Sequence, residues 1–89
     1  MAYRIEFTPR AERDFKSLDG SIRGRIKQRI DSLAENPYPQ GIKKIEGGDE
    51  LYRLRVGDYR ILYQVKSKIL LVLIVGIGHR RDIYRRIGG

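Results

Sequence analysis

The chain has 89 residues, of which 19 are Lys or Arg and 11 are Asp or Glu, so its formal net charge is +8. It contains no Cys and one His, which excludes disulfides, cysteine–zinc and iron–sulfur sites, a thiol nucleophile and a histidine-rich metal site. This length predicts one domain over residues 1–89 and no deep cofactor cavity, so we expect no cofactor and no metal. The longest apolar run, Ile69–Val75, is far below the ~18 residues of a membrane span, and the first residues do not resemble a signal peptide. We therefore expect a soluble, cytoplasmic protein.

The first half of the sequence predicts a strand followed by two helices. Apolar and charged residues alternate over 3–7, as in a half-buried strand, and Thr8-Pro9 then supplies an N-cap and a proline suited to the first helical position. After the break at 19–21, Ser21 is predicted to cap a second helix. The apolar stripe of that helix consists of Ile22, Ile26, Ile30 and Leu33, and its basic positions are Arg23, Arg25, Lys27 and Arg29. We interpret these basic positions as a solvent-facing surface in preference to a second RNA-contact surface.

A β-hairpin is predicted after the polar connection that follows Asn36-Pro37. The segments 51–56 and 59–65 flank Gly57-Asp58, a two-residue turn of the kind that joins hairpin strands. The turn sets the register, so that Arg55 lies opposite Arg60 and Arg53 lies opposite Leu62. The face suited to a core then carries Tyr52, Leu54, Val56, Tyr59, Ile61 and Tyr63. The other face receives the three arginines.

The remaining sequence predicts a central strand and a short basic segment. Residues 69–77 are apolar at nearly every position, which is typical of a strand buried on both faces. Strict alternation along it places Leu71, Leu73, Val75 and then His79 on the arginine face. Residues 79–86 predict a basic turn or helix. The order strand–helix–helix–strand–strand–strand indicates an α+β fold, with a helical hairpin on one face of a mostly antiparallel sheet.

The positive charge is concentrated in the second half of the chain. Residues 1–50 carry 10 basic and 9 acidic side chains, a net +1, whereas residues 51–89 carry 9 and 2, a net +7. This asymmetry favours a polyanionic partner, meaning nucleic acid or an acidic protein. Guanidinium groups hold phosphate oxygens in a bidentate fork, so Arg53, Arg55 and Arg60 suit a phosphate clamp. The charge pattern alone is equally compatible with arginines that only maintain solubility.

Three blocks of residues resemble a known family. They are Lys44-Ile45-Glu46-Gly47, the hairpin Leu51-Tyr52-Arg53-Leu54-Arg55-Val56-Gly57-Asp58-Tyr59-Arg60-Ile61-Leu62-Tyr63, and Val75-Gly76-Ile77-Gly78-His79-Arg80-Arg81-Asp82-Ile83-Tyr84. Together with the opening strand and helices, they are similar to the RelE branch of the RelE/ParE toxin superfamily over essentially the whole chain. The resemblance implies the toxin of a type II toxin–antitoxin pair, which enters the ribosomal A site, contacts 16S rRNA and cuts the mRNA there without a metal. It also implies neutralisation by a RelB-like antitoxin.

The resemblance also implies roles for individual residues. Metal-free RNA cleavage needs a base for the 2′-hydroxyl proton, cations for the charge that grows on phosphorus, and an acid for the departing 5′-oxygen. Arg60 and Arg80 suit charge stabilisation, and Tyr84 suits stacking on a base or orientation of the hydroxyl. Arg53 and Arg55 occupy positions where relatives have lysine, and arginine does not serve as a base. We therefore assign His79 as a candidate for proton transfer, because histidine exchanges protons near neutral pH.

Two other functions stay open on the sequence alone. ParE-type relatives share the fold but inhibit DNA gyrase, and a weakened RelE homologue would bind the ribosome or the antitoxin and cleave poorly. We expect the antitoxin to be acidic, amphipathic and partly disordered. Its predicted contact surface includes Leu62, Leu71 and Leu73.

Overall fold

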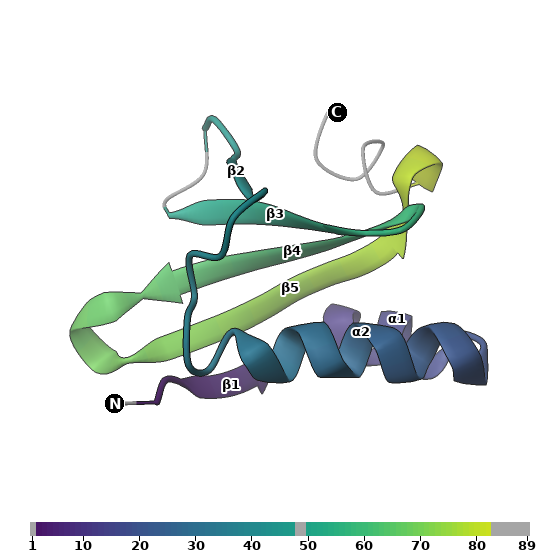
Figure 1. Ribbon diagram of the computed structural model, residues 1–89, viewed down its shortest axis with the longest axis horizontal. Helices are drawn as coiled ribbons and strands as arrows, with labels where there is room; N and C mark the ends of the chain where they lie inside the picture. The colour runs from purple at the N-terminus through teal and green to yellow at the C-terminus, as the bar shows by residue number, and fades with distance from the viewer. Residues whose placement is uncertain (1, 48–49, 83–89) are drawn as a thin grey trace.

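One mixed sheet packs against two α-helices in a computed structural model that describes residues 2–47 and 50–82 (Figure 1). Residues 80–82, in the segment predicted as a basic turn or helix, are helical, and the rest of that segment lies outside the described residues. In chain order the elements are β1 (Arg4–Phe7), α1 (Pro9–Lys16), α2 (Gly20–Ser32), β2 (Lys43–Lys44), β3 (Leu51–Val56), β4 (Tyr59–Lys66), the 3-10 helix η1 (Ser67–Ile69) and β5 (Leu71–His79). None of the helices in these described ranges is both long and apolar enough to cross a bilayer.

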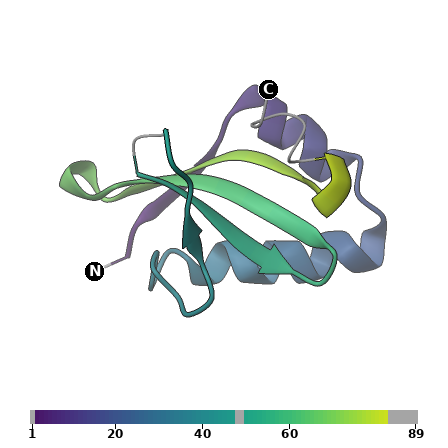
Figure 2. The same ribbon diagram turned by 90° about the horizontal axis from the view of Figure 1, so that it is seen from above.

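The five strands are arranged in the order β1-β5-β4-β3-β2 (Figures 1 and 2). β1 pairs with β5 in parallel, and every other neighbouring pair is antiparallel. The predicted α+β class and mostly antiparallel sheet are confirmed. β5 lies between β1 and β4, which explains why its sequence is apolar at almost every position. The two-residue strand β2 was not expected, because a pair of lysines carries no alternation.

One core lies between the helices and one face of the sheet. From α2 it receives Ile26 and Ile30, and Leu33 follows as the C-cap residue; each of the three is at most 1% exposed. Ile22, the remaining residue of the predicted apolar stripe, is half-buried and packs against this core. The sheet contributes Leu54, Val56, Ile61, Tyr63, Val65, Val72, Ile74 and Ile77. Burial of each large aliphatic side chain stabilises the fold by about 1.5–3 kcal/mol. Because this face is committed to the core, the opposite face of the hairpin is available for other contacts.

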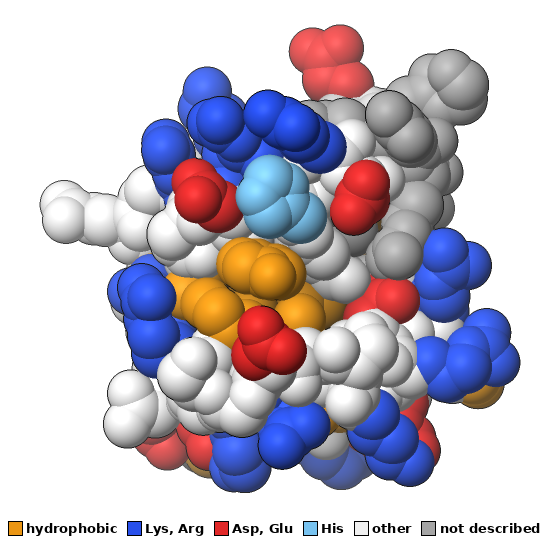
Figure 3. All heavy atoms as spheres, turned by 90° about the vertical axis from the view of Figure 1, so that its right-hand side faces the viewer, with side chains coloured by type: hydrophobic (Ala, Val, Ile, Leu, Met, Phe, Trp, Pro, Cys, Tyr) orange, Lys and Arg blue, Asp and Glu red, His pale blue; other side chains and the backbone are white. Residues whose placement is uncertain are grey.

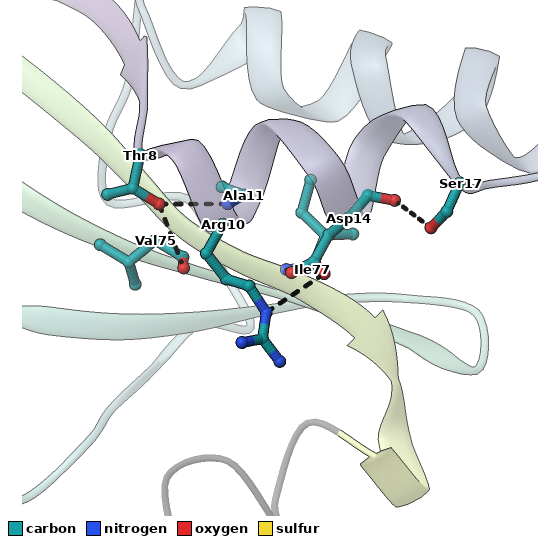
Figure 4. Close-up of polar contacts among 7 residues, drawn as sticks. All are labelled: Thr8, Arg10, Ala11, Asp14, Ser17, Val75 and Ile77. Carbon is teal, nitrogen blue, oxygen red and sulfur yellow. Dashed lines mark hydrogen bonds and ion pairs between the residues drawn. The ribbon is translucent and has the colours of Figure 1, made fainter.

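Hydrogen bonds fasten α1 to β5 at the point where β1 ends (Figure 4). Thr8 caps α1 by accepting from the Ala11 amide at 3.1 Å, and its own amide donates to the Ile74 carbonyl at 2.9 Å. Beyond Ile74, β5 has no further pairing to β1, and Asp14 Oδ2 accepts from the Ile77 amide at 3.1 Å instead. Asp14 also lies 3.6 Å from Arg10 Nε and is 9% exposed. Asp14 therefore caps the edge of β5 and does not face solvent.

Two element boundaries differ from the prediction. α2 is N-capped by Asp19, so Ser21 lies inside the helix and is not its cap. The last strand runs from Leu71 to His79 and starts two residues later than expected, because η1 and a left-handed Leu70, with φ of 52°, come first. Ile69 is consequently 57% exposed.

The β3–β4 hairpin has the predicted register. Val56 pairs with Tyr59, Arg55 with Arg60, and the pairs continue to Leu51 and Gln64. Gly57 has φ of +59° at the first position of the turn, in the left-handed region that glycine occupies without steric cost. The turn chemistry therefore fixes which side chains occupy each face of the hairpin.

Tyrosines attach the connection before β3 to the core. Tyr63 is fully buried, and its hydroxyl donates to the Pro37 carbonyl at 2.8 Å. Its ring lies 5.8 Å from that of Tyr52, which lies 5.6 Å from that of Tyr38. Burial, and then the neighbouring Tyr52 and Tyr38, raise the pKa of Tyr63 above its ordinary value. The connection is thus packed on the domain.

Candidate nucleic-acid interface

The face of the sheet opposite the core carries Arg53, Arg55 and Arg60. These residues alternate with buried ones along β3 and β4, and Arg55 pairs directly with Arg60. Like charges opposite each other across two strands are destabilising by some tenths of a kcal/mol, up to about 1 kcal/mol. The fold therefore holds an unfavourable pair of cations that a bound anion would relieve. We call this surface the arginine face.

Arg60 is the most deeply buried cation of the arginine face. It is 6% exposed, and its Nη1 donates to two neutral acceptors, the carbonyls of Gly57 at 3.4 Å and Tyr59 at 3.2 Å. Its Nε is buried and has no hydrogen-bond partner within the described ranges. Buried cations are ordinarily paired with an anion, so this arrangement is unusual and makes Arg60 a candidate for anion binding.

Ion pairs in the described part of the chain are confined to its N-terminal third. They are Arg4–Glu6, Arg10–Asp14, Lys16–Glu12 and Lys27–Asp31. None of these four involves Arg55, Arg60 or Arg80. The guanidiniums of Arg55, Arg60 and Arg80 are therefore not neutralised by carboxylates of the described residues, which leaves a positive potential around them.

Arg80 lies next to the hairpin turn. It directly follows β5, its side chain is exposed, and its amide donates to the Asp58 carbonyl at 2.8 Å. Asp58 is two residues before Arg60, so this bond brings the segment after β5 to the same end of the molecule as the buried guanidinium. Tyr84, the remaining candidate, lies outside the described residues.

His79 is on the opposite side of the sheet from the arginine face, and the predicted placement is wrong. The register between β4 and β5 shifts at Leu62/Tyr63: Leu62 pairs with Gly76 and Tyr63 pairs with Ile74, so Val75 is an extra residue. Such a bulge reverses the faces beyond it. His79 consequently pairs with Tyr59, and the two rings lie 5.6 Å apart.

The surroundings of His79 are acidic. It borders a hollow of about 230 Å³ that also involves Asp14, Asp19 and Asp82. Its Nδ1 accepts from the Arg81 amide at 3.3 Å, which leaves Nε2 as the protonated nitrogen of the neutral ring. Figure 3 shows the histidine in the middle of this end of the molecule, between acidic side chains and above apolar ones. This environment is separate from the one that surrounds Arg60.

Two glycines form part of the arginine face and were not predicted as functional. Gly78 pairs with Arg60, and Gly76 pairs with Leu62. Neither glycine contributes a side chain at these two positions of β5, opposite Arg60 and Leu62. The available signal was the pair of glycines at the end of an apolar strand, since a strand glycine often marks a close approach by a ligand or another backbone.

The leucines of this face are less available than expected. Leu62 is 3% exposed and Leu71 is 6% exposed, and only Leu73 is partly open. The prediction that all three offer apolar surface to a partner is therefore wrong for Leu62 and Leu71. What the face exposes is mainly charge.

Comparisons with known proteins agree with this architecture. Residues 5–84 match the profile of the ParE toxin of type II toxin–antitoxin systems, parDE. The chain is 33% identical over 88 residues to putative toxin RelE1 of Methanocaldococcus jannaschii, covering 96% of this chain and 98% of that one. It is 29% identical over 82 residues to the mRNA interferase toxin RelE of Escherichia coli K12, covering 90% and 85% of the two chains. A chain of the archaeal RelE–RelB complex from Pyrococcus horikoshii superposes with a TM-score of 0.80 at 30% identity, covering 92% of this chain and 99% of that chain.

The fold and the relatives together define the class of protein. The chain belongs to the RelE/ParE superfamily of toxins from type II toxin–antitoxin systems. The profile is described by the ParE name and these relatives by the RelE name. The predicted resemblance is thereby confirmed.

Proposed function

We propose that this toxin is a ribosome-dependent endoribonuclease that cleaves translated mRNA in the A site without a metal. The observation that carries the proposal is the buried Arg60, whose Nε lacks a partner among the described residues, held opposite Arg55 and close to the segment of Arg80. A gyrase inhibitor has no evident need for a buried, uncompensated guanidinium. The printed name of the E. coli relative, an mRNA interferase, supports the same choice.

The proposed reaction is a transesterification within the RNA strand. The 2′-oxygen forms a bond to the adjacent phosphorus, the bond from phosphorus to the 5′-oxygen breaks, and the products are a 2′,3′-cyclic phosphate and a 5′-hydroxyl. Negative charge on the non-bridging oxygens increases in the transition state, where preorganised donors stabilise it most. Arg60 supplies a fixed donor at the base of the face, while Arg53, Arg55 and Arg80 hold the flanking phosphates.

Among its described residues, the arginine face offers no evident general base for the proton transfers of this reaction. Its described ionisable side chains at this end are guanidiniums, which stay protonated and do not accept the 2′-hydroxyl proton. His79 lies on the other face of the sheet. We propose that hydroxide or a phosphate oxygen of the substrate takes the proton and that water supplies the one needed by the 5′-oxygen. His79→Ala is then expected to keep the wild-type pH profile between about pH 5 and 9.

We also propose an acidic, RelB-like antitoxin as the partner that restrains this activity. Solved relatives are described as RelE–RelB complexes from Pyrococcus horikoshii and Methanococcus jannaschii. The guanidiniums of Arg55, Arg60 and Arg80, which have no carboxylate partner among the described residues, suit an acidic segment, because complementary charge accelerates and orients association. The antitoxin would then neutralise the same arginines that bind RNA.

The test is cleavage of a defined mRNA on purified ribosomes, with the 5′ ends of the fragments mapped. The proposal expects in-frame cuts within the A-site codon, no cuts in free mRNA, and a loss of about a hundredfold for Arg60→Gln. The matched control is Lys66→Gln, which removes one charge from an exposed position of the same strand.

The alternatives give different results in the same experiment. Intact message together with inhibition of DNA gyrase supercoiling would establish the ParE-type function. Ribosome binding with intact message and active gyrase would identify the weakened homologue. Both results overturn the proposed nuclease.

A further inference from the structure

A second basic hollow lies between α2 and the tip of the β3–β4 hairpin. It has a volume of about 260 Å³ and is lined by Arg25, Gln28, Arg29, Arg55, Val56 and Gly57. Three of its six residues are arginines, which come from two elements distant in the sequence. Gln28 adds an amide that can donate hydrogen bonds. Every charged residue that lines the hollow is therefore positive.

These arginines have no carboxylate partners within the described ranges. Arg25, Arg29 and Arg55 take part in none of the four ion pairs there, whereas Lys27, on the same helix, is paired with Asp31 at 2.7 Å. Arg25 and Arg29 are one helical turn apart, a spacing at which like charges repel. On helix α2, Lys27 outside the hollow is thus paired with a carboxylate, whereas Arg25 and Arg29, which line the hollow, are in none of these ion pairs.

The turn of the hairpin lies against an arginine of helix α2. The guanidinium Nη2 of Arg25 lies 3.7 Å from the position that a Cβ atom of Gly57 would occupy. β2 pairs with β3 only at Arg53 and Tyr52, so the described chain places no strand beside β3 from Leu54 to the turn. The hollow is consequently open to a ligand along this edge.

We propose that Arg25, Arg29 and Arg55 form a second phosphate-binding site, which holds a backbone phosphate of a single-stranded RNA next to the one at Arg60. Arg55 connects the two sites, because it lines this hollow and pairs directly with Arg60. Guanidiniums without carboxylates, grouped around a hollow, match the charge and the donor geometry of a phosphodiester. The basic surface of α2 is then an RNA contact and not the solvent-facing surface that the sequence suggested.

The inference rests on the proposed function only in taking RNA as the bound nucleic acid. Phosphate binding itself is measurable without cleavage. The test compares wild type with Arg25→Gln/Arg29→Gln for binding to a short 2′-O-methyl oligoribonucleotide, which lacks the attacking hydroxyl. Fluorescence anisotropy over a range of salt concentrations gives the affinity and its salt dependence. Loss of two contacts is expected to reduce the log–log slope by about 1.4 and to weaken binding roughly 10- to 30-fold near 0.1 M salt.

The matched control is Lys16→Gln/Lys27→Gln. It also removes two positive charges, but from exposed lysines that are ion-paired to Glu12 and Asp31. Circular dichroism establishes that each variant is folded. The proposal expects this control to keep the wild-type slope, and equal losses for both double variants would overturn the site in favour of general charge attraction.

A polyglutamate peptide, measured with the same variants, separates RNA from an acidic protein partner. Weaker binding of polyglutamate with unchanged binding of the oligoribonucleotide would overturn the phosphate site. The ribosome assay separates this inference from the proposed function. If the double variant binds the oligoribonucleotide more weakly but the wild-type protein does not cleave mRNA on ribosomes, only the proposed nuclease is refuted. If the wild-type protein cleaves mRNA but the double variant binds the oligoribonucleotide as tightly as the wild type does, only the second site is refuted.

Discussion

Arg60 is a buried cation whose surroundings are unfavourable for folding, and the proposed function gives a reason for its presence. Its guanidinium is removed from water, yet its Nη1 donates only to neutral carbonyls and its Nε lacks a described partner. Removal of a cation from water without an anion costs several kcal/mol in principle, and residual hydration lowers that cost. The free protein holds this guanidinium without an anion, and under the proposed function an RNA phosphate would supply one.

The first prediction concerns Arg60→Met, which keeps the apolar stem and removes the charge. We expect the free energy of unfolding to rise by about 1 kcal/mol, because a buried cation without a partner is replaced by an apolar side chain. Ribosome-dependent cleavage should fall about a hundredfold. Urea denaturation and the cleavage assay measure the two effects, and a less stable variant would show that Arg60 is structural.

Tyr63 gives a prediction about alkaline pH. Burial raises its pKa in the folded state above the 10.0 of an exposed tyrosine, so the folded protein retains the proton more strongly than the unfolded chain does. The stabilisation is therefore complete below pH 10.0 and decreases as pH rises above it. Urea denaturation between pH 8 and about pH 11 should show this decrease.

Tyr63→Phe is the control for that pH dependence. The variant should lose about 1 kcal/mol at neutral pH, because the Pro37 carbonyl loses its donor. Its stability should then fall less steeply at alkaline pH than that of the wild type. An equally steep fall would assign the effect to other groups, including Tyr52, whose pKa burial also raises.

At the scale of elements, the register of the hairpin was predictable, whereas the last strand was predicted but its register with β4 was not. The two-residue turn has glycine at its first position, and apolar and polar residues alternate on both strands. Together these features determine one register, and the structure shows that register. β5 has nearly uniform apolar character, so no alternation indicates where Val75 is inserted into the pairing. The faces beyond the bulge, and with them the position of His79, depend on pairing with β4.

Asp14 illustrates a second limit of the sequence. On a short helix with charged neighbours, an aspartate is ordinarily assigned to the solvent side, and its spacing contains no contrary signal. Its role depends on Ile77, a residue 63 positions away, whose amide donates to the Asp14 carboxylate at the edge of β5. Only the three-dimensional fold places the Ile77 amide next to Asp14 on α1.

The third prediction concerns this contact between α1 and β5. Asp14→Ala should lower the free energy of unfolding by about 1–3 kcal/mol, because the buried Ile77 amide loses its acceptor. Asp14→Asn keeps an acceptor oxygen and loses mainly the pair with partly exposed Arg10, so its cost should be below about 1 kcal/mol. Thermal and urea unfolding compare the two, and equal costs would show that charge, not the hydrogen bond, is what matters.

At the scale of the whole molecule, charge is separated along the chain and in space. The described ion pairs involve residues 4 to 31, whereas Arg55, Arg60 and Arg80 have no carboxylate partner in the described part of the chain. The net charges of +1 and +7 for the two parts of the sequence already indicated this separation. The sequence did not indicate that Arg25 and Arg29, in the nearly neutral part, lie beside Arg55.

The fourth prediction follows from this separation. Binding of the wild type to ribosomes or to single-stranded RNA should weaken with salt, with a log–log slope of about −3.5 for five phosphate contacts. Equilibrium binding at several salt concentrations measures the slope. A salt-independent affinity would contradict recognition through phosphates.

The pairing of β1 with β5 has a consequence for how the protein is made. Arg4 and Leu71 are register partners, so the first strand acquires this neighbour only after residue 71 has been synthesised. Contacts between residues so distant in sequence form late and slowly. Since Arg60 pairs with Gly78 and Arg80 is bonded to Asp58, the nascent chain cannot assemble its arginines before translation has passed β5. Under the proposed function, these arginines can therefore act together on RNA only after residues 71–80 have been synthesised and paired.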